Sequence, residues 1–256
     1  MSACGFAATS TTMLIFNRPP DLLLATLIAL AAMLDYHLQW LNPTNLKEVW
    51  KSYTSKYKYW LALAFIVAFA FLYILDIAQL LFLGHLCILA LAYGYGLSLG
   101  SLKIPPLRNI NYLKIFLIVY VWVALTVCLP LIGAAVSLKA IALESVQRAF
   151  FYLALTLPFD IRDERSDKEQ KLKTLANKLG TVKTKWLSAI CLGLSLAITV
   201  IFYEAAVYIA VVGSHGICLL LVFLAKKTRP FLYYTVLMDG TIVMQYLFIL
   251  ILKPIL

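Results

Sequence analysis

The sequence predicts an all-α protein, a polytopic transmembrane helical bundle of about eight spans. Three observations support this fold class. Hydrophobic residues make up 63% of the chain and charged residues only 13%, whereas soluble domains carry about 25% charged residues. Several apolar runs approach the roughly 20 residues that a helix needs to cross a bilayer. The basic residues also gather in a few loops, as they do on the cytoplasmic side of membrane proteins.

The apolar runs define the expected helices in order. Each run is bounded by charged or turn-forming residues, which favour helix ends and loops. The expected helices are 21–41, 59–75, 77–98, 113–136, 138–159, 186–204, 205–225 and 231–252. Residues 1–20 have too short an apolar part to cross a bilayer, so we expect a short non-spanning N-terminal segment. Residues 1–256 are expected to form a single integral membrane domain.

The charge distribution predicts the topology. Tight turns near Asp76, Ser137 and Glu204 join the helices in pairs, and longer polar loops lie between the pairs. The four longer loops, counted through the first helical residues after them, hold 18 of the 22 Lys and Arg residues. Because basic loops are retained on the cytoplasmic side, we expect these loops to face the cytoplasm. The net charge of +10 is explained by this orientation, and we expect no nucleic-acid partner.

A group of aspartates follows the apolar part of the fifth expected helix. Asp160, Asp163 and Asp167 are spaced i, i+3 and i+7, so at about 100° per residue they lie on one helix face. Neighbouring carboxylates repel one another, and a divalent cation removes that repulsion. Mg²⁺ is commonly held by one or two carboxylates with phosphate oxygens and water. The spacing predicts a Mg²⁺ site for a phosphorylated ligand at the membrane boundary; a solvated loop of mixed charge is the alternative.

Basic residues follow the aspartates. If the helix continues, Lys171 falls on the same face as the carboxylates, about 20° from Asp160. A diphosphate at this face could then contact the metal and an ammonium group together. The basic residues of the segment are Lys168, Lys171, Lys173 and Lys178.

The segment resembles the second aspartate-rich motif of the UbiA prenyltransferase superfamily. The motif residues are Asp160-x-x-Asp163-x-x-x-Asp167, followed by Lys173-Thr174-Leu175 and Leu179-Gly180. The resemblance implies a helical bundle with a lipid-accessible cavity at the cytoplasmic face. It also implies transfer of an isoprenyl group from a polyprenyl diphosphate to a hydrophobic, often aromatic, acceptor with Mg²⁺ as cofactor. The implied location is the bacterial inner membrane, among membrane lipid, with the active site facing the cytoplasm.

The resemblance also implies roles for individual residues. Asp163 and Asp167 would be metal-linked carboxylates, with Asp160 as a third metal ligand and Lys173 as a diphosphate contact. The implied catalytic residues are Asp163, Asp167 and Lys173. The expected substrate-binding residues are Asp160, Lys171, His37 and Arg148.

The sequence departs from the family in two places. The family has nine spans, and the predicted topology matches it if the first span is missing. The first aspartate-rich motif, N-D-x-x-D, is not intact, because the corresponding helix end offers only Asp35, His37 and Asn42. His37 is therefore interpreted either as a ligand contact or as a hydrogen-bonded histidine at the membrane interface.

Arg148 is a charged residue inside an expected span. It lies about 18 Å from Asp160 at a rise of 1.5 Å per residue, and charges at such depth are costly and often functional. Arg148 either lines the cavity as a substrate contact or pairs with Glu144 one turn earlier. Some aromatic residues could stabilise a carbocation through cation–π contacts. These are Tyr93, Tyr95, Phe116, Tyr120, Trp122 and Phe151.

The leading hypothesis is a Mg²⁺-dependent membrane prenyltransferase. One alternative is a family member with changed chemistry, such as diphosphate removal or cyclisation. Another is a catalytically silent homologue that only binds isoprenoid lipid. A transporter would be expected to have functional polar groups near the middle of the membrane, whereas the acidic group here lies at the boundary.

Overall fold

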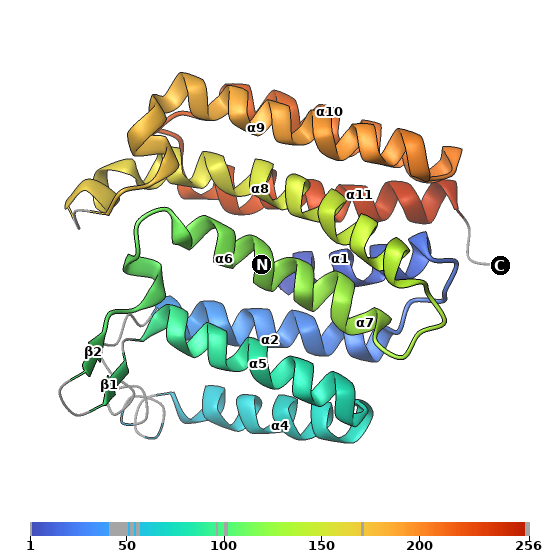
Figure 1. The fold of residues 1–256 in the computed structure, drawn as a ribbon, viewed down its shortest axis with the longest axis horizontal. Coiled ribbons are helices and arrows are strands. Elements are labelled where there is room, and N and C mark those ends of the chain that lie inside the picture. Colours follow the sequence, from blue (N-terminus) through green and yellow to red (C-terminus); the bar gives the residue numbers. More distant parts are fainter. Residues whose placement is uncertain are drawn as a thin grey trace.

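Helices make up most of the molecule (Figure 1), because apolar segments in lipid must pair their backbone groups internally. The structure, a computed structural model, describes residues 2–40, 51, 54, 57–95, 97–99, 102–169 and 172–253. The helices of the first half are α1 (Ser2–Ile15), α2 (Leu22–Trp40), α4 (Lys58–Ile74), α5 (Ile77–Gly94), α6 (Leu113–Val123) and α7 (Leu129–Leu131). Those of the second half are α8 (Leu138–Glu169), α9 (Leu175–Phe202), α10 (Ala205–Leu224) and α11 (Asp239–Leu252).

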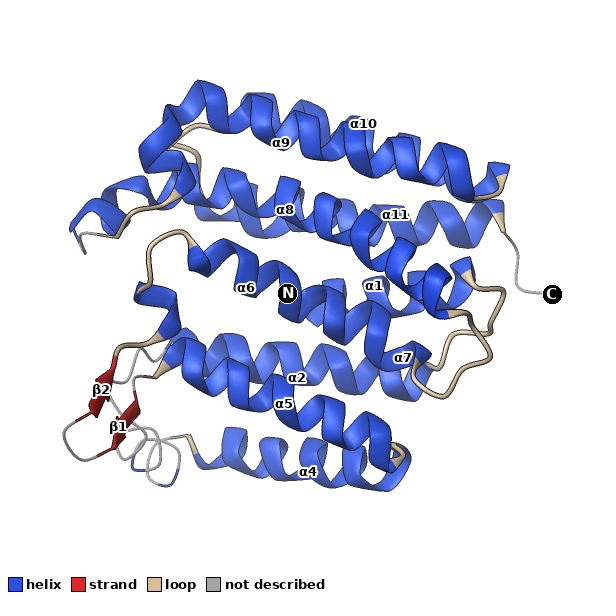
Figure 2. Ribbon diagram, viewed as in Figure 1, coloured by secondary structure: helices blue, strands red, loops and turns tan. Residues whose placement is uncertain are grey.

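Shorter elements connect these helices. The π-helical turn η2 (Ala124–Cys128) joins α6 to α7, and η3 (Tyr233–Met238) leads into α11. The expected polar loop 99–112 contains part of a small antiparallel sheet (Figure 2), made of β1 (Leu97–Leu99) and β2 (Leu102–Ile104), and a 3₁₀ turn, η1 (Leu107–Asn109). Because β1 begins at Leu97, α5 ends at Gly94 instead of the expected residue 98.

The outer surface of the bundle is apolar. Phe69 and Tyr73 of α4 are 71% and 85% exposed, which suits lipid and not water. Six helical segments of the described chain are long and apolar enough to cross a membrane. They are Ile77–Gly94, Leu113–Leu131, Leu138–Glu169, Leu175–Phe202, Ala205–Leu224 and Tyr233–Leu252. The chain is therefore a polytopic helical membrane protein, as predicted, and the number of about eight spans stays a prediction.

Helix α1 was not among the expected helices. It packs against α2 and α11, and its small residues allow close approach; a Cβ at Gly5 would lie 3.4 Å from the Ala29 Cα atom. The Ser and Thr side chains at positions 9–12 are fully buried, which neither their polarity nor the helix's 14 residues would predict. Helix α1 is therefore stabilised by burial among neighbouring helices, and its hydropathy alone does not identify it.

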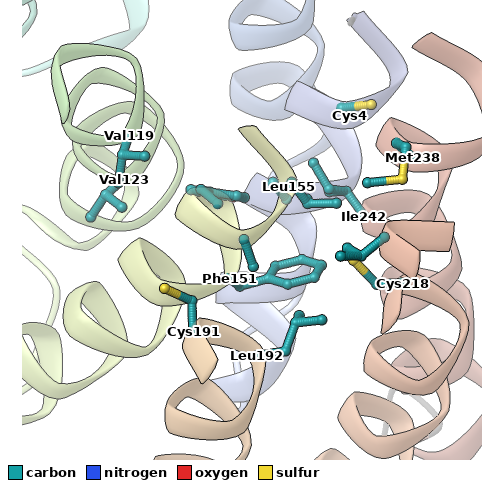
Figure 3. Packing of buried hydrophobic residues seen from close by; sticks show 14 of the residues in the cluster. Cys4, Val119, Val123, Phe151, Leu155, Cys191, Leu192, Cys218, Met238 and Ile242 are labelled. Atoms are coloured by element: carbon teal, nitrogen blue, oxygen red, sulfur yellow. The ribbon is translucent and has the colours of Figure 1, made fainter. Parts of the chain in front are cut away.

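The main hydrophobic core lies among α1, α6, α8, α9, α10 and α11. Phe151 and Leu155 of α8 lie at its centre, close to Leu192 of α9 and Ile242 of α11 (Figure 3). A second cluster joins α2, α4, α5 and η2–α7.

The C-terminal end of α8 was predicted incorrectly. The sequence predicted a loop over 160–185, whereas α8 continues to Glu169 and α9 begins at Leu175. The end of the apolar run was not the end of the helix, because Asp, Arg, Glu and Lys are tolerated in a helix that projects beyond the membrane. At the start of α9, the Thr174 side chain caps the helix by accepting from the Asn177 amide at 3.3 Å. Gly180, with φ of +79°, interrupts the helical geometry of α9.

Pro158 lies inside α8, where it cannot donate to the carbonyl of Ala154. The hydroxyl of Ser188 on α9 donates to this carbonyl at 2.5 Å, in a buried position. The contact ties α8 to α9 immediately before the acidic segment.

The two ends of the bundle differ. The short connections α4–α5, α7–α8 and α9–α10 lie at one end with the C-terminus, and the sheet and the end of α8 lie at the other (Figure 1). At the first end, Asp76 forms a capping box with Gln79, which closes the α4–α5 turn. The last turns of α8, which carry Asp160, Asp163 and Asp167, lie at the other end of the bundle, hereafter called the polar end.

Candidate functional site

The centre of the candidate site is a pair of buried carboxylates on α8. Asp160 and Asp167 are each 5% exposed. The Nζ atom of Lys114, from the first turn of α6, lies 3.7 Å from Oδ1 of Asp160 and 3.7 Å from Oδ1 of Asp167. Asp167 Oδ2 is buried and has no hydrogen-bond partner among the described residues. The i, i+7 spacing thus brings two carboxylates together, as predicted, and α6 supplies a cation between them.

Asp163 interacts electrostatically with both aspartates, but its own ion pair is with Arg162 and not with Lys114. Its two oxygens accept from Arg162 at 2.6 and 2.9 Å, a bidentate contact that uses both of them. The Arg162 guanidinium also lies 5.0 Å from the ring centre of Phe159, 5.4 Å from that of Phe231 and 5.5 Å from that of Tyr234. These rings hold Arg162 in place, so Asp163 is directed toward a packed cation at the edge of the site.

Glu164, one turn after Asp160 on the same helix, forms a third ionic contact. It accepts from Lys168 at 2.6 Å and pairs with Lys227, of the α10–η3 connection, at 2.7 Å. These lysines are exposed, so the contact is screened by solvent and contributes little stability. Its geometric consequence is to tether the end of α8 to the α10–η3 connection.

The connection between η1 and α6 lies beside the connection between α8 and α9. The amide of Tyr112 donates to the carbonyl of Lys173 at 2.9 Å, and the amide of Lys173 donates to Asn111 Oδ1 at 2.9 Å. Tyr112 has a left-handed φ of 64°, which is costly for a side chain of this size. These contacts bring Lys173 to a small pocket that Lys114 and Asp160 also line.

A larger apolar cavity of about 250 Å³ lies among α2, α5, α6 and η2. Its wall is mostly Leu, Ile, Val and Ala, and few of its residues are polar or aromatic. The residues that depart from the aliphatic lining are Asp35, Tyr36, Cys87, Tyr93, Trp122 and Thr126.

The cavity residue Tyr93 lies within electrostatic reach of the carboxylates. The Tyr93 hydroxyl interacts electrostatically with Asp35, Asp160 and Asp167. Tyr36 interacts in the same way with Arg162. Asp35, the acidic remnant of the first motif, therefore lies on the same side of the cavity as the second motif. An amphiphile could place its apolar part in the cavity and its anionic part near Lys114.

Of the predicted substrate contacts, His37 packs against aromatic rings and Lys171 cannot be placed. His37 stacks on Trp60 with ring centres 4.0 Å apart and an angle of 9°, and its ring meets Tyr57 edge-on at 5.2 Å. These contacts fit the interpretation of His37 as an interfacial residue packed against α4. Lys171 and Asn42 lie outside the described residues.

Arg148 pairs with Glu144, which was one of its two predicted roles. Its Nε donates to Glu144 Oε1 at 2.7 Å, and Tyr203 donates to Glu144 Oε2 at 2.6 Å. Arg148 is fully buried and does not line the 250 Å³ cavity. Next to this pair, Gln147 donates to Ser195 and Thr199, which links α8 to α9 in the same layer.

Five of the six aromatic residues proposed to stabilise a carbocation fall into three groups. Tyr93 and Trp122 line the cavity. Phe151 stacks on His215 inside the core, with ring centres 4.6 Å apart. Phe116 and Tyr120 are 51% and 47% exposed on the outer surface of α6.

The donor set offers a pair of carboxylates for Mg²⁺, Asp160 and Asp167, while the third predicted ligand, Asp163, pairs with Arg162. In the part of the chain that the structure describes, no three His, Cys, Asp or Glu side chains are grouped closely enough to hold a metal by themselves. Mg²⁺ is commonly bound by one or two carboxylates with phosphate oxygens and water. Asp160 and Asp167 can provide such a pair, because Asp167 Oδ2 is buried without a partner. Asp163 is engaged by Arg162.

Lys114 belongs to this site but was not among the site residues predicted from the sequence. Its signal is present in the sequence, because it is the charged residue at the start of the apolar run 113–136. Only the packing of α6 against α8 reveals that it meets the aspartates.

Comparison of the chain with protein-family models, with curated proteins and with solved structures finds no match.

Proposed function

We propose that this protein is a UbiA-type membrane prenyltransferase, which transfers an isoprenyl group from a polyprenyl diphosphate to a hydrophobic acceptor. The observation that carries the proposal is the buried pair Asp160 and Asp167 beside Lys114, near Tyr93 of an apolar cavity. Such a site can hold the diphosphate at the polar end and the isoprenyl chain among aliphatic side chains.

The number of helical rods also supports the proposal. Among the described residues, the helices form nine rods if η2 and η3 are counted with the helices that they continue. Helix α1 is the first rod. It precedes α2, the helix whose end corresponds to the first aspartate-rich motif of the family. The nine rods equal the family's nine spans in number, and six of them are long and apolar enough to cross a membrane.

Each part of the site has a distinct task in the proposed reaction. Asp160 and Asp167 would hold Mg²⁺, which neutralises charge on the departing diphosphate. Lys114 and Lys173, which line the same small pocket, would donate to phosphate oxygens. Tyr93 and Trp122 present aromatic rings to the cavity, where they can stabilise an allylic cation. The aliphatic lining keeps water away from that cation.

Asp163 has a positioning role in this proposal. Both of its oxygens are used by Arg162, and the rings of Phe159 and Tyr234 fix the guanidinium. The fixed Arg162 adds positive potential next to Tyr36 at the cavity. Asp163 therefore supports the site through Arg162, in place of the metal contact that the resemblance implies.

The proposed location is the bacterial inner membrane, with the polar end in the cytoplasm. The support is the concentration of Lys and Arg in the loops of this end. Polyprenyl diphosphates carry charged head groups, so a site at this end can be reached from the aqueous side of the membrane.

The test is incubation of the purified protein with labelled geranylgeranyl diphosphate, Mg²⁺ and a membrane lipid extract. We expect a Mg²⁺-dependent labelled lipid product. Asp167→Asn should lower its rate about 10- to 100-fold, the usual cost of disturbing a metal site. Asp163→Asn is the matched variant and should lower the rate less, because it loses an arginine contact and not a metal ligand.

Two outcomes contradict the proposal. If no Mg²⁺-dependent product forms with diphosphates of several chain lengths, the protein is not a prenyltransferase. Binding of the labelled diphosphate without any product would instead favour the silent homologue that binds isoprenoid lipid. The observation that favours this second candidate is the pairing of the carboxylates with Lys114 and Arg162. Equal losses in Asp163→Asn and Asp167→Asn would contradict their separate roles.

A further inference from the structure

Lys114 lies between the two carboxylates that the proposed function assigns to a metal. Its Nζ atom is 3.7 Å from one oxygen of each, and its side chain is 22% exposed while both aspartate side chains are 7% exposed. The ammonium comes from α6 and the carboxylates from α8, so the contact also bridges two helices. The lysine thus occupies the space between the oxygens in which a divalent cation would be held.

The charge of the pair is only partly balanced. Lys114 provides one positive charge for two buried carboxylates, and Asp167 Oδ2 has no hydrogen-bond partner among the described residues. A buried carboxylate oxygen without a partner is costly. The nearby Arg162 is already opposed by Asp163. The site therefore attracts a further cation, although Lys114 stands where that cation would bind.

We propose that Lys114 is a displaceable counter-cation, which keeps Mg²⁺ affinity low until a diphosphate binds; this inference rests on the proposed function. An ammonium and a divalent cation between the same two oxygens repel each other. A diphosphate offers the ammonium an alternative anion. Lysine can follow it, because its long stem is flexible and its ammonium donates in several directions.

The small pocket beside the carboxylates gives Lys114 a place to move. It is lined by Lys114, Asp160, Lys173 and Thr174. A diphosphate between the two lysines would draw the Lys114 ammonium away from Asp167 and leave both aspartates to the metal. Metal and diphosphate then bind cooperatively, and each raises the affinity of the other by the same factor.

The test measures Mn²⁺ binding to the full-length protein in detergent by equilibrium dialysis. The measurement is made with and without inorganic pyrophosphate, which is present in both dialysis chambers. In the unmodified protein we expect pyrophosphate to raise Mn²⁺ affinity about tenfold, within the usual range of coupling between sites. Lys114→Met should bind Mn²⁺ about tenfold more tightly without pyrophosphate and gain little from adding it. Lys114→Gln, a second neutral variant, should behave in the same way.

Lys173→Met is the matched control, because Lys173 lines the same pocket and, among the described residues, the ion pairs of Asp160 and Asp167 are with Lys114. It should keep the low Mn²⁺ affinity of the unmodified protein when pyrophosphate is absent. If the unmodified protein and both Lys114 variants bind Mn²⁺ equally well without pyrophosphate, Lys114 does not compete with the metal and the inference is wrong, while the metal site stands. If none of them binds Mn²⁺ even with pyrophosphate, the metal site of the proposed function is wrong as well.

Discussion

Arg148 and Glu144 form a fully buried ion pair inside a membrane helix. Both side chains are at most 1% exposed, and Arg148 Nε lies 2.7 Å from Glu144 Oε1. The two remaining guanidinium nitrogens have no hydrogen-bond partner in the described part of the chain. Such a pair adds little net stability compared with apolar residues, but loss of one partner leaves an uncompensated charge. Its position outside the cavity makes it a structural element between α8 and Tyr203.

The structural role of Arg148 predicts a loss of stability when the pair is broken. Arg148→Met leaves Glu144 buried with only Tyr203 as a partner, so the free energy of unfolding should fall by about 3–5 kcal/mol. Unfolding of the detergent-solubilised protein by dodecyl sulfate measures this change.

The matched control is the double variant Glu144→Gln with Arg148→Met, which removes both charges. It should recover much of the lost stability, because no buried charge remains unpaired. A stable Arg148→Met variant that no longer binds polyprenyl diphosphate would instead favour the original prediction of Arg148 as a substrate contact.

At the scale of elements, α8 connects the core to the site. Its first half carries Phe151 and Leu155 of the main core, and its last turns carry Asp160 and Asp167. Pro158 stands between these parts and leaves the Ala154 carbonyl without its helical donor. Because Ser188 donates to that carbonyl at 2.5 Å, α9 fixes the direction in which the acidic segment leaves the membrane.

Ser188→Ala should therefore destabilise the protein. It leaves a buried carbonyl without a donor, which costs about 1–3 kcal/mol, and the same dodecyl sulfate titration measures the loss. In a Pro158→Ala background the helix supplies its own donor to Ala154, so the cost of Ser188→Ala should be smaller. An equal cost in both backgrounds would show that Ser188 acts through some other contact.

For the whole molecule, the charges and the helix pairing divide the bundle into two chemically different ends. The polar end holds the sheet, the carboxylates and their lysines, and the other end holds short turns such as the Asp76 capping box. This arrangement follows from the retention of basic loops on one side of the membrane.

The topology can be measured directly. A reporter fused after Lys168 should be cytoplasmic, and the same reporter inserted at Ser137, in the connection between α7 and α8, should be extracytoplasmic. An extracytoplasmic signal after Lys168 would overturn the orientation and with it the access of a cytoplasmic diphosphate to the site.

The helical membrane fold was predictable from local features. Apolar runs of about 20 residues must be helical in lipid, and the structure has helices at all the expected ranges, with shifted ends. The ends shifted most at α8 and α9, since hydropathy marks where the membrane ends and not where the helix ends. The position of α1 could not be predicted, because its buried Ser and Thr residues are polar and its 14 residues are few.

The sequence by itself determined that the protein is a helical membrane protein with its carboxylates and basic residues gathered at one end. Its spacing also placed Asp160 and Asp167 on one face of any helix that includes both, and the structure showed that α8 continues far enough to do so. Only the tertiary structure decided that Lys114 lies between them and that Asp163 turns to Arg162. The physical reason is that local spacing fixes positions along one helix, whereas the partner of a buried charge is set by which helix packs against it.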